Sequence, residues 1–309
     1  MFYNVIMLGI VENYLDYLKF NKNYSSQTID SYGRDIAKFL DFMNDEGYTL
    51  QSVDATLIRN FLARETLNQI SKRSNARRVI ALRRFYEYLI KNNIVESNPF
   101  LTINTPKIDK KLPEFLYIEE INKLFSENEK RTDFLAKRDQ AIIELLFASG
   151  LRVSELSNLT LQNINLKERV MRIVGKGNKE RRVPFSVSAQ KALQSYFETT
   201  RKEILNKNEL FDGSPFVFLN DKGGRLTSRG VEYILNQIEK KLGLTMSLHP
   251  HKFRHTFATY LLNRGLDLRL IQEMMGHSSL GTTQVYTHVS NQKMREEYMK
   301  AFPRQKKDI

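Results

Sequence analysis

Residues 249–259 read HPHKFRHTFAT and contain three of the chain's five histidines, with an arginine at position 254. Two further histidines and a tyrosine follow in GHS at residues 276–278 and YTH at residues 286–288. Upstream, residues 150–156 read GLRVSEL and residues 175–178 read GKGN. Within these motifs, two arginines, two histidines, a lysine and a tyrosine form a set suited to handling a phosphodiester.

These residue types match the chemistry of displacement at phosphorus. The reaction places negative charge on the non-bridging oxygens, and arginine is the preferred donor because its planar fork matches a phosphate. A tyrosine can be the nucleophile, but a phenol with a pKa of about 10 is rarely ionised at neutral pH and needs cationic neighbours or a base. The sugar alkoxide leaves poorly, so a lysine or histidine has to protonate it.

The chain resembles the tyrosine site-specific recombinases, or phage integrase family, and within them the bacterial Xer type, with the XerC branch as the closer match. The resemblance rests on residues 150–156, 175–181, 249–259 and 276–288, and it covers nearly the whole chain. It implies a mainly α fold with a small β-sheet. We expect a helical, SAM-like core-binding domain at residues 1–106 and an α/β tyrosine-recombinase catalytic domain at residues 107–309.

The resemblance also implies how the matching residues handle the phosphate. Tyr286 would attack the scissile phosphate and give a 3′-phosphotyrosyl intermediate with a free 5′-hydroxyl. Arg152 and Arg254 would hold the phosphate, and His277 would donate a hydrogen bond to it. Cleavage and rejoining in this way amount to site-specific DNA recombination, and the resemblance suggests the resolution of chromosome dimers at a dif-like site.

Two further residues would move protons. His251 would assist transfer from the nucleophile, and Lys176 would protonate the leaving oxygen. No cofactor and no metal are implied. A lysine at a glycine-flanked turn is ordinarily a solvated loop residue, so Lys176 depends most on the resemblance.

Other readings stay open from the residues alone. Arg152 and Glu155 are three positions apart and could form an intrahelical ion pair, and Tyr286 could be one more core aromatic. His251 and His255, at helical spacing, could serve a metal-dependent nuclease or hydrolase, although the set lacks the glutamate of a zincin and any thiolate. A third possibility is a basic DNA-binding protein without chemistry.

The composition agrees with a polyanionic partner. With 48 lysines and arginines against 35 aspartates and glutamates, the net charge is +13, which favours nucleic acid. The chain has no cysteine, which excludes disulfides and a cysteine nucleophile and fits a cytoplasmic location. The apolar run from Val5 to Val11 is far shorter than the ~18 residues of a membrane span, so we expect it to open the first helix.

Apolar residues at helical spacing predict helices before residue 106 and a mixture of helices and strands after it. In the first part, we expect helices from Ser25 or Ser26 onward, around residues 57–62, and over residues 74–91. In the second part, we expect helices at residues 117–125 and 137–149, a hairpin of strands at residues 170–174 and 181–184, and a third strand at residues 216–218. The proline-containing residues 98–113 predict a linker.

A basic segment accompanies the predicted helix at residues 74–91. Its ordinary reading is a solvated helix face. In a chain suspected of handling phosphodiesters, we interpret the charges as DNA contacts that neutralise phosphates. The candidate residues are Lys72, Arg73, Arg77, Arg84 and Lys91.

The resemblance implies partners as well. Double-stranded DNA would be bound by four recombinase protomers on two duplexes, with a XerD-like recombinase as the homologous partner and an FtsK-like DNA translocase as activator. Residues 291–309 would form a helix exchanged between protomers. Their apolar residues also fit a helix that packs on its own domain.

Overall fold

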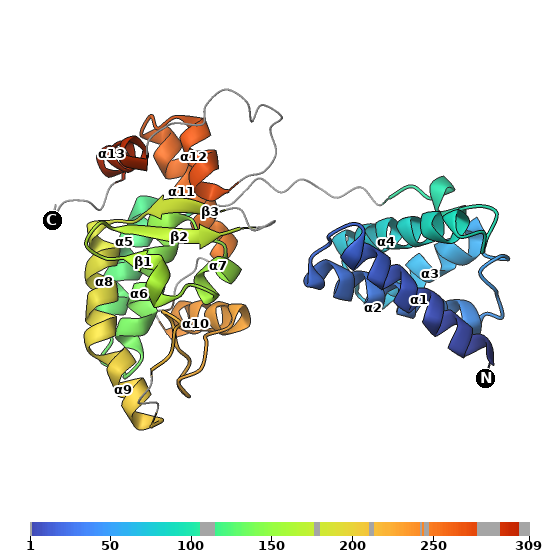
Figure 1. Cartoon of the computed structure of the whole chain (residues 1–309), viewed down its shortest axis with the longest axis horizontal. Helices are drawn as coiled ribbons and strands as arrows, with labels where there is room; N and C mark the ends of the chain where they lie inside the picture. The colour runs from blue at the N-terminus through green and yellow to red at the C-terminus, as the bar shows by residue number, and fades with distance from the viewer. Residues whose placement is uncertain are drawn as a thin grey trace. The chain divides into compact units, whose positions relative to one another are not determined.

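The computed structural model describes residues 2–105, 115–175, 180–209, 213–241, 243, 247–276 and 291–302. The chain divides into two compact units, Met1–Lys111 and Leu112–Ile309 (Figure 1). Each unit has its own cluster of buried apolar side chains. Among the helices in the described ranges, none combines the length and the apolar character needed to cross a membrane.

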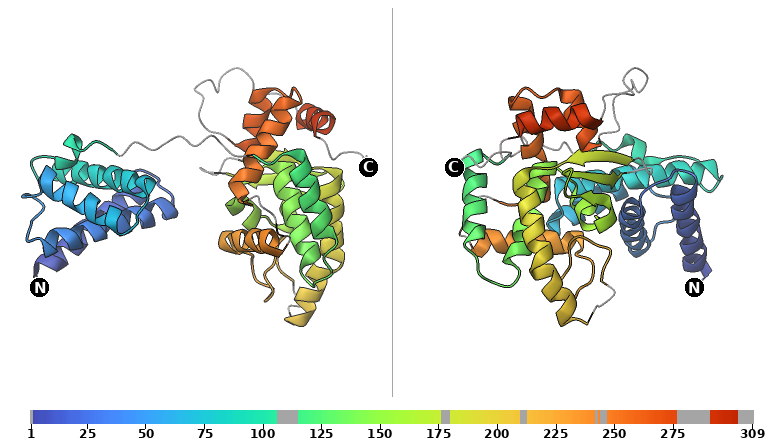
Figure 2. Two further views of the ribbon diagram at one scale, coloured as in Figure 1. Left: turned by 180° about the vertical axis from the view of Figure 1, so that it is seen from behind. Right: turned by 60° about the vertical axis from the view of Figure 1, so that its left-hand side comes forward.

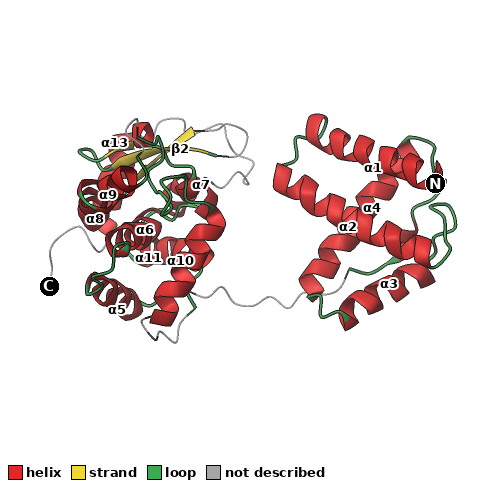
Figure 3. Ribbon diagram, turned by 90° about the horizontal axis from the view of Figure 1, so that it is seen from below, coloured by secondary structure: helices red, strands yellow, loops and turns green. Residues whose placement is uncertain are grey.

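The described residues of the first unit are helical throughout their regular structure, as the colouring of Figure 3 shows. The helices are α1 (Phe2–Phe20), α2 (Ser26–Asp45), α3 (Ala55–Leu67), α4 (Lys72–Lys91) and the short 3₁₀ helix η1 (Pro99–Thr102). Ser25, Asp54 and Ser71 each accept a hydrogen bond from the backbone N–H three residues further on. These caps satisfy N–H groups that a helix start leaves without a partner. The helices predicted in this part of the chain are therefore confirmed.

A charged network lies inside the first unit, between α2, α3 and α4. Arg78 on α4 is only 6% exposed and donates to Asp35 and Glu65, which are also buried. Lys38 adds a contact of 3.3 Å to Glu65, and Arg77 pairs with Asp35. Burial alone would raise the pKa of Glu65, but the charges and hydrogen bonds of Arg78 and Lys38 together outweigh it and lower that pKa. Arg78 therefore belongs to the interior of this unit.

Arg78→Ala is expected to destabilise the first unit by about 3–5 kcal/mol, because it leaves two buried carboxylates without their shared cation. Hydrogen exchange of peptides from α2 to α4, followed by mass spectrometry in the full chain, measures the change. Arg34→Ala is the matched control, since Arg34 is an exposed arginine on α2. Equal exchange in the two variants would contradict the prediction.

The second unit combines nine described helices with one small sheet. The helices are α5 (Ile118–Glu129), α6 (Ala136–Ser149), α7 (Val153–Ser157), α8 (Val187–Glu198), α9 (Thr200–Lys207), α10 (Ser228–Lys241), α11 (Pro250–Asn263), α12 (Leu268–Met275) and α13 (Asn291–Ala301), with a 3₁₀ turn η2 at Leu161–Asn163. The strands are β1 (Ile164–Asn165), β2 (Val170–Val174) and β3 (Glu180–Pro184), in the order β1-β2-β3. The helices predicted at residues 117–125 and 137–149 are confirmed.

The predicted hairpin is also confirmed, because β2 and β3 pair antiparallel with Arg172 opposite Arg182. The third strand predicted at residues 216–218 is wrong. Phe216 and Leu219 form only isolated bridges, to Thr160 and Arg225, and the sheet's third strand is β1. The segment is apolar as expected, but it bends at Val217 and Phe218, and each flanking segment offers it a single bridge, so no ladder forms.

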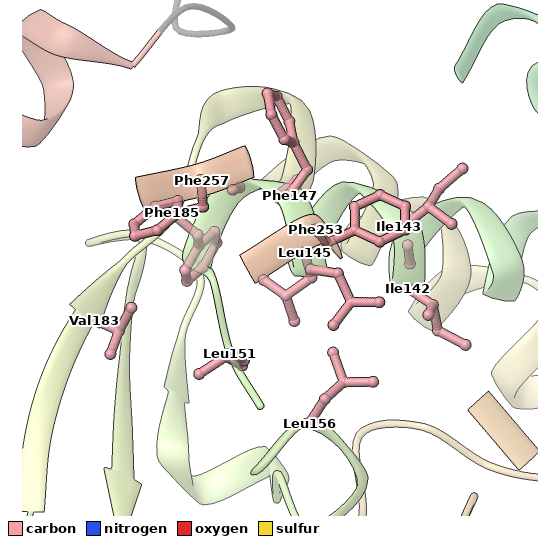
Figure 4. Close-up of a cluster of buried hydrophobic side chains, with 14 of the residues drawn as sticks. Ile142, Ile143, Leu145, Phe147, Leu151, Leu156, Val183, Phe185, Phe253 and Phe257 are labelled. Atoms are coloured by element: carbon pink, nitrogen blue, oxygen red, sulfur yellow. The ribbon is translucent and has the colours of Figure 1, made fainter. Parts of the chain in front are cut away.

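Helix α6 lies at the centre of the second unit and packs against α5, α8 and α11. The buried cluster in Figure 4 joins α6, the segment after it, the β3 region and α11 through Ile142, Ile143, Leu145, Phe147, Leu151, Leu156, Val183, Phe185, Phe253 and Phe257. Removing one large side chain from such a cluster typically costs about 3–5 kcal/mol. These contacts fix the position of α11, and with it Arg254.

Helix α13 packs on its own unit. Met294, Tyr298 and Phe302 are buried in the core of the second unit, and the Tyr298 hydroxyl donates to the Ala148 carbonyl at 2.6 Å. Helices α12 and α13 both contact β3, and both views in Figure 2 draw them together. In the single chain, α13 therefore packs on its own domain, which is the second possibility considered from the sequence. Exchange of this helix between protomers stays a prediction.

Candidate active site

Arg254 is held by two backbone carbonyls from distant parts of the second unit. It lies on α11 beside the fully buried Phe253 and is itself only 7% exposed. Its Nη1 donates to the Gly150 carbonyl at 2.6 Å, and its Nη2 donates to the Met275 carbonyl at 2.6 Å. The guanidinium group is therefore fixed before any ligand arrives.

Gly150 has to be glycine for two reasons. Its φ of +58° lies in the left-handed region, and it ends α6. A Cβ added there would lie 2.5 Å from the Phe257 ring. The close approach of α11 that brings Arg254 to the Gly150 carbonyl depends on this missing side chain.

Arg152 follows two residues later and is more accessible, with 38% of its side chain exposed. Its backbone N–H and its Nη1 donate to the two oxygens of Glu155, at 2.9 and 2.8 Å, while its Nη2 lies 3.3 Å from the Gly276 carbonyl. The ion pair considered from sequence therefore exists. It orients Arg152 toward the same helix end that holds Arg254.

Arg181, on β3, is a third arginine of the cluster. Its Nη1 and Nη2 donate to the Glu155 oxygens at 3.0 and 2.8 Å, and its Nε donates to the Met274 carbonyl at 2.7 Å. Arg181 lies at the end of the motif at residues 175–181, but no role was predicted for it from the sequence. A signal was present, since alternation along β3 places Arg181 on the same face as the buried Val183.

The three arginines meet at the carboxyl end of α12. The carbonyls of Met274, Met275 and Gly276 accept from Arg181, Arg254 and Arg152 in turn. The last carbonyls of a helix have no partner within it and carry the negative end of the helix dipole. Gly276, with a φ of +65°, closes the helix.

The electrostatics of this cluster favour an anion. Burial, followed by the neighbouring charge of Arg152, lowers the pKa of Arg254 to about 10. Arg254 is still charged at neutral pH, but its charge is less well solvated than in water. Burial by itself would raise the pKa of Glu155, yet the hydrogen bonds from Arg181 and Arg152, together with the charge of Arg181, outweigh it and lower that pKa. Arg152 and Arg181 thus share the ionised Glu155, while Arg254 binds backbone carbonyls, and the cluster keeps positive charge for a phosphate.

The other predicted site residues are placed only in part. His251 is exposed on the first turn of α11, three positions before Arg254 and therefore on a neighbouring part of its surface. Lys176, His277 and Tyr286 lie outside the described residues. Gly276 immediately precedes His277 in the sequence. Within the described ranges, no group of three or more histidine, aspartate or glutamate side chains could hold a metal ion.

The predicted DNA-contact residues lie on or at the ends of α4. Lys72, Arg73, Arg84 and Lys91 are exposed. Arg77 is half-buried, and its Nη1 donates to the Ser31 carbonyl at 3.1 Å as well as pairing with Asp35. The charge of Arg77 is therefore partly neutralised within the unit, whereas the other four charges face solvent.

Comparison with known proteins identifies both units. Residues 114–293 match the phage integrase family, and residues 11–93 match the N-terminal SAM-like domain of phage integrases. The chain is 44% identical over 295 residues to the tyrosine recombinase XerC of Oceanobacillus iheyensis, covering 95% of this chain and 96% of that protein. It is 39% identical over 297 residues to the tyrosine recombinase XerC of Bacillus subtilis, covering 96% and 97%.

Among solved structures, the site-specific recombinase XerH in a post-cleavage complex with a palindromic difH substrate is 27% identical, with a TM-score of 0.65, over 90% of this chain and 81% of that one. An integrase of the Tn1549 transposon, with a TM-score of 0.69 at 18% identity over 94% and 98%, shows the same fold. The chain therefore belongs to the phage integrase family of tyrosine recombinases, and within that family to the Xer type.

Proposed function

We propose that this recombinase binds the scissile phosphate of DNA with Arg152 and Arg254 and attacks it with Tyr286. The observation that carries the proposal is the meeting of Arg152, Arg254 and Arg181 at one helix end, where Arg152 and Arg181 both bind the Glu155 carboxylate. A fixed group of cations can stabilise the charge that develops on a phosphate in the transition state.

The two phosphate-binding arginines have donors to spare. Arg254 uses one hydrogen on each of its terminal nitrogens for the Gly150 and Met275 carbonyls, and a guanidinium group has five N–H donors in all. Arg152 is partly exposed, so its remaining donors can reach a ligand. The carbonyls fix the orientation of the forks, and the phosphate would accept from the other donors.

The proton transfers are assigned to the remaining residues. His251 would assist removal of the proton from Tyr286, His277 would donate to the phosphate, and Lys176 would protonate the departing 5′-oxygen. The phosphotyrosyl bond keeps the energy of the broken phosphodiester. A 5′-hydroxyl from another duplex can therefore reverse the step without ATP, and the outcome is recombination.

The biological substrate is proposed from the family. Relatives of the Xer type and a XerH structure with a difH substrate support a dif-like site and the resolution of chromosome dimers during chromosome partition and cell division, in the cytoplasm. Residues 1–106 would be the core-binding domain and residues 107–309 the catalytic domain. Lys72, Arg73, Arg84 and Lys91 would neutralise phosphates, with a smaller share from Arg77 because Asp35 already pairs with it.

Assembly follows the same reasoning. Four protomers would act on two duplexes, either alone or with a XerD-like partner, and an FtsK-like translocase would activate them. Residues 291–309 would link neighbouring protomers, which requires α13 to leave the core position that it occupies in the single chain.

DNA cleavage is expected to proceed at an unchanged rate in excess EDTA, because side-chain cations meet the phosphate charge. The test uses a duplex with a dif-like site that carries a nick close to the cleaved position. Cleavage then releases a short fragment with the free 5′-hydroxyl, which diffuses away, so the covalent protein–DNA adduct accumulates. Adduct formation is followed by denaturing electrophoresis with and without EDTA. An adduct that appears only after Mg²⁺ is restored would contradict the proposal. Strand cleavage that needs Mg²⁺ and leaves no adduct would favour a metal-dependent nuclease.

A further inference from the structure

Arg181 has a side chain that is only 9% exposed, and its described contacts are all with groups of the active-site cluster. We propose that Arg181 is a positioning residue, which keeps Arg152 available for the phosphate and fixes the carboxyl end of α12. The inference rests on the proposed function and deepens it, since Arg181 acts through Arg152 and α12 without touching the substrate.

The first step concerns the sharing of Glu155. Arg181 approaches both carboxylate oxygens, at 3.0 and 2.8 Å, whereas the side chain of Arg152 reaches only Oε1, through Nη1 at 2.8 Å. A carboxylate readily accepts an arginine in a two-bond fork. Without Arg181, Glu155 would be able to take Arg152 in that geometry. The donors of Arg152 that the phosphate needs would then be turned toward Glu155.

The second step concerns α12. The Nε of Arg181 donates to the Met274 carbonyl at 2.7 Å, and the next two carbonyls hold Arg254 and Arg152. The helix end and the guanidinium group of Arg181 are in close contact, because a Cβ on Gly276 would lie 3.0 Å from Nη1. Arg181 therefore sets the position of the carbonyls that orient both phosphate-binding arginines.

The third step concerns the hairpin. Arg181 is on β3, five positions after Lys176 and within the same motif at residues 175–181. One side chain thus ties the strand that follows Lys176 to the helix that precedes His277. Without this contact, we expect β3 and α12 to shift relative to each other. A misplacement of ~1 Å in an active site can cost ~10²-fold in rate.

Three variants test the proposal. Arg181→Ala removes all the contacts, and Arg181→Lys keeps the charge but cannot bind both Glu155 oxygens and the Met274 carbonyl together. Arg182→Ala is the matched control, because Arg182 is the next residue on β3, is exposed, and points to the other face of the strand. Single-turnover cleavage of the nicked dif-like duplex and DNA affinity are measured for each.

The expected result is a ~10²-fold slower cleavage for Arg181→Ala and at least ~10-fold for Arg181→Lys, with DNA affinity within ~3-fold of the wild type. Arg182→Ala should cleave like the wild type. A wild-type rate in Arg181→Lys, or an equal loss in Arg182→Ala, would overturn the proposal. If Arg181→Ala does not fold, as judged by thermal unfolding, Arg181→Lys decides alone.

A substrate without the phosphate charge separates positioning from general structural support. With a neutral methylphosphonate at the cleaved position, the oxygen that Arg152 meets no longer carries its charge. The defect of Arg181→Ala, or of Arg181→Lys if only that variant folds, should shrink several-fold or more on this substrate; a defect of the same size on both substrates would overturn the role through Arg152. If the wild type forms no adduct on the unmodified nicked duplex, the proposed function fails. If the Arg181 variants form the adduct on that duplex as fast as the wild type, only this inference fails.

Discussion

Arg254→Ala is expected to slow DNA cleavage by ~10²–10³-fold, the usual cost of removing one preorganised donor from a charged transition state. The arginine is nearly buried and is held by the carbonyls of Gly150 and Met275. Its donors are therefore already oriented when the phosphate arrives. Arg254→Lys should lose much of the same rate, because an ammonium group cannot bridge two carbonyls and a phosphate with a planar fork.

Single-turnover cleavage of the nicked duplex measures the effect, and thermal unfolding shows whether the variant keeps its fold without the two buried hydrogen bonds. Arg264→Ala is the matched control, since Arg264 is an exposed arginine just after the same helix. A rate near that of the wild type in Arg254→Lys, or the same loss in Arg264→Ala, would show that Arg254 does not bind the phosphate.

The regular elements near the site could be predicted from local sequence. The glycines of GKGN and the alternation around them predicted the β2–β3 hairpin, and GLRVSEL placed Arg152 three positions before Glu155, where the ion pair is found. Both features depend on residues close together in the chain. The strand predicted at residues 216–218 failed because strand formation depends on a distant partner, and the partners there offer single bridges.

The role of Arg181 could not be predicted in the same way. Its contacts with Glu155 and Met274 span 26 and 93 positions of sequence. No local spacing joins those residues. The packing of α12 against β3 brings Met274 to Arg181, and Glu155 reaches it from α7. The basic segment of α4 shows the same limit, since sequence alone does not separate the buried Arg78 from the exposed Arg84.

Tyr286→Phe is expected to abolish the covalent adduct altogether, the largest effect of any single substitution. The change removes the phenolic oxygen that attacks phosphorus in the proposed mechanism and keeps an aromatic ring of nearly the same size. DNA affinity should stay close to that of the wild type, because the cationic groups are untouched. Tyr233→Phe is the matched control, since Tyr233 is 64% exposed on α10 and has no proposed part in the reaction.

The most direct test is to identify the bond between protein and DNA. The wild-type chain is incubated with the nicked dif-like duplex, the adduct is digested, and mass spectrometry locates the modified residue. We expect a 3′-phosphate joined to the Tyr286 oxygen, and no adduct in Tyr286→Phe. A nucleotide attached to another residue, or an adduct that survives in Tyr286→Phe, would contradict the mechanism proposed for this recombinase.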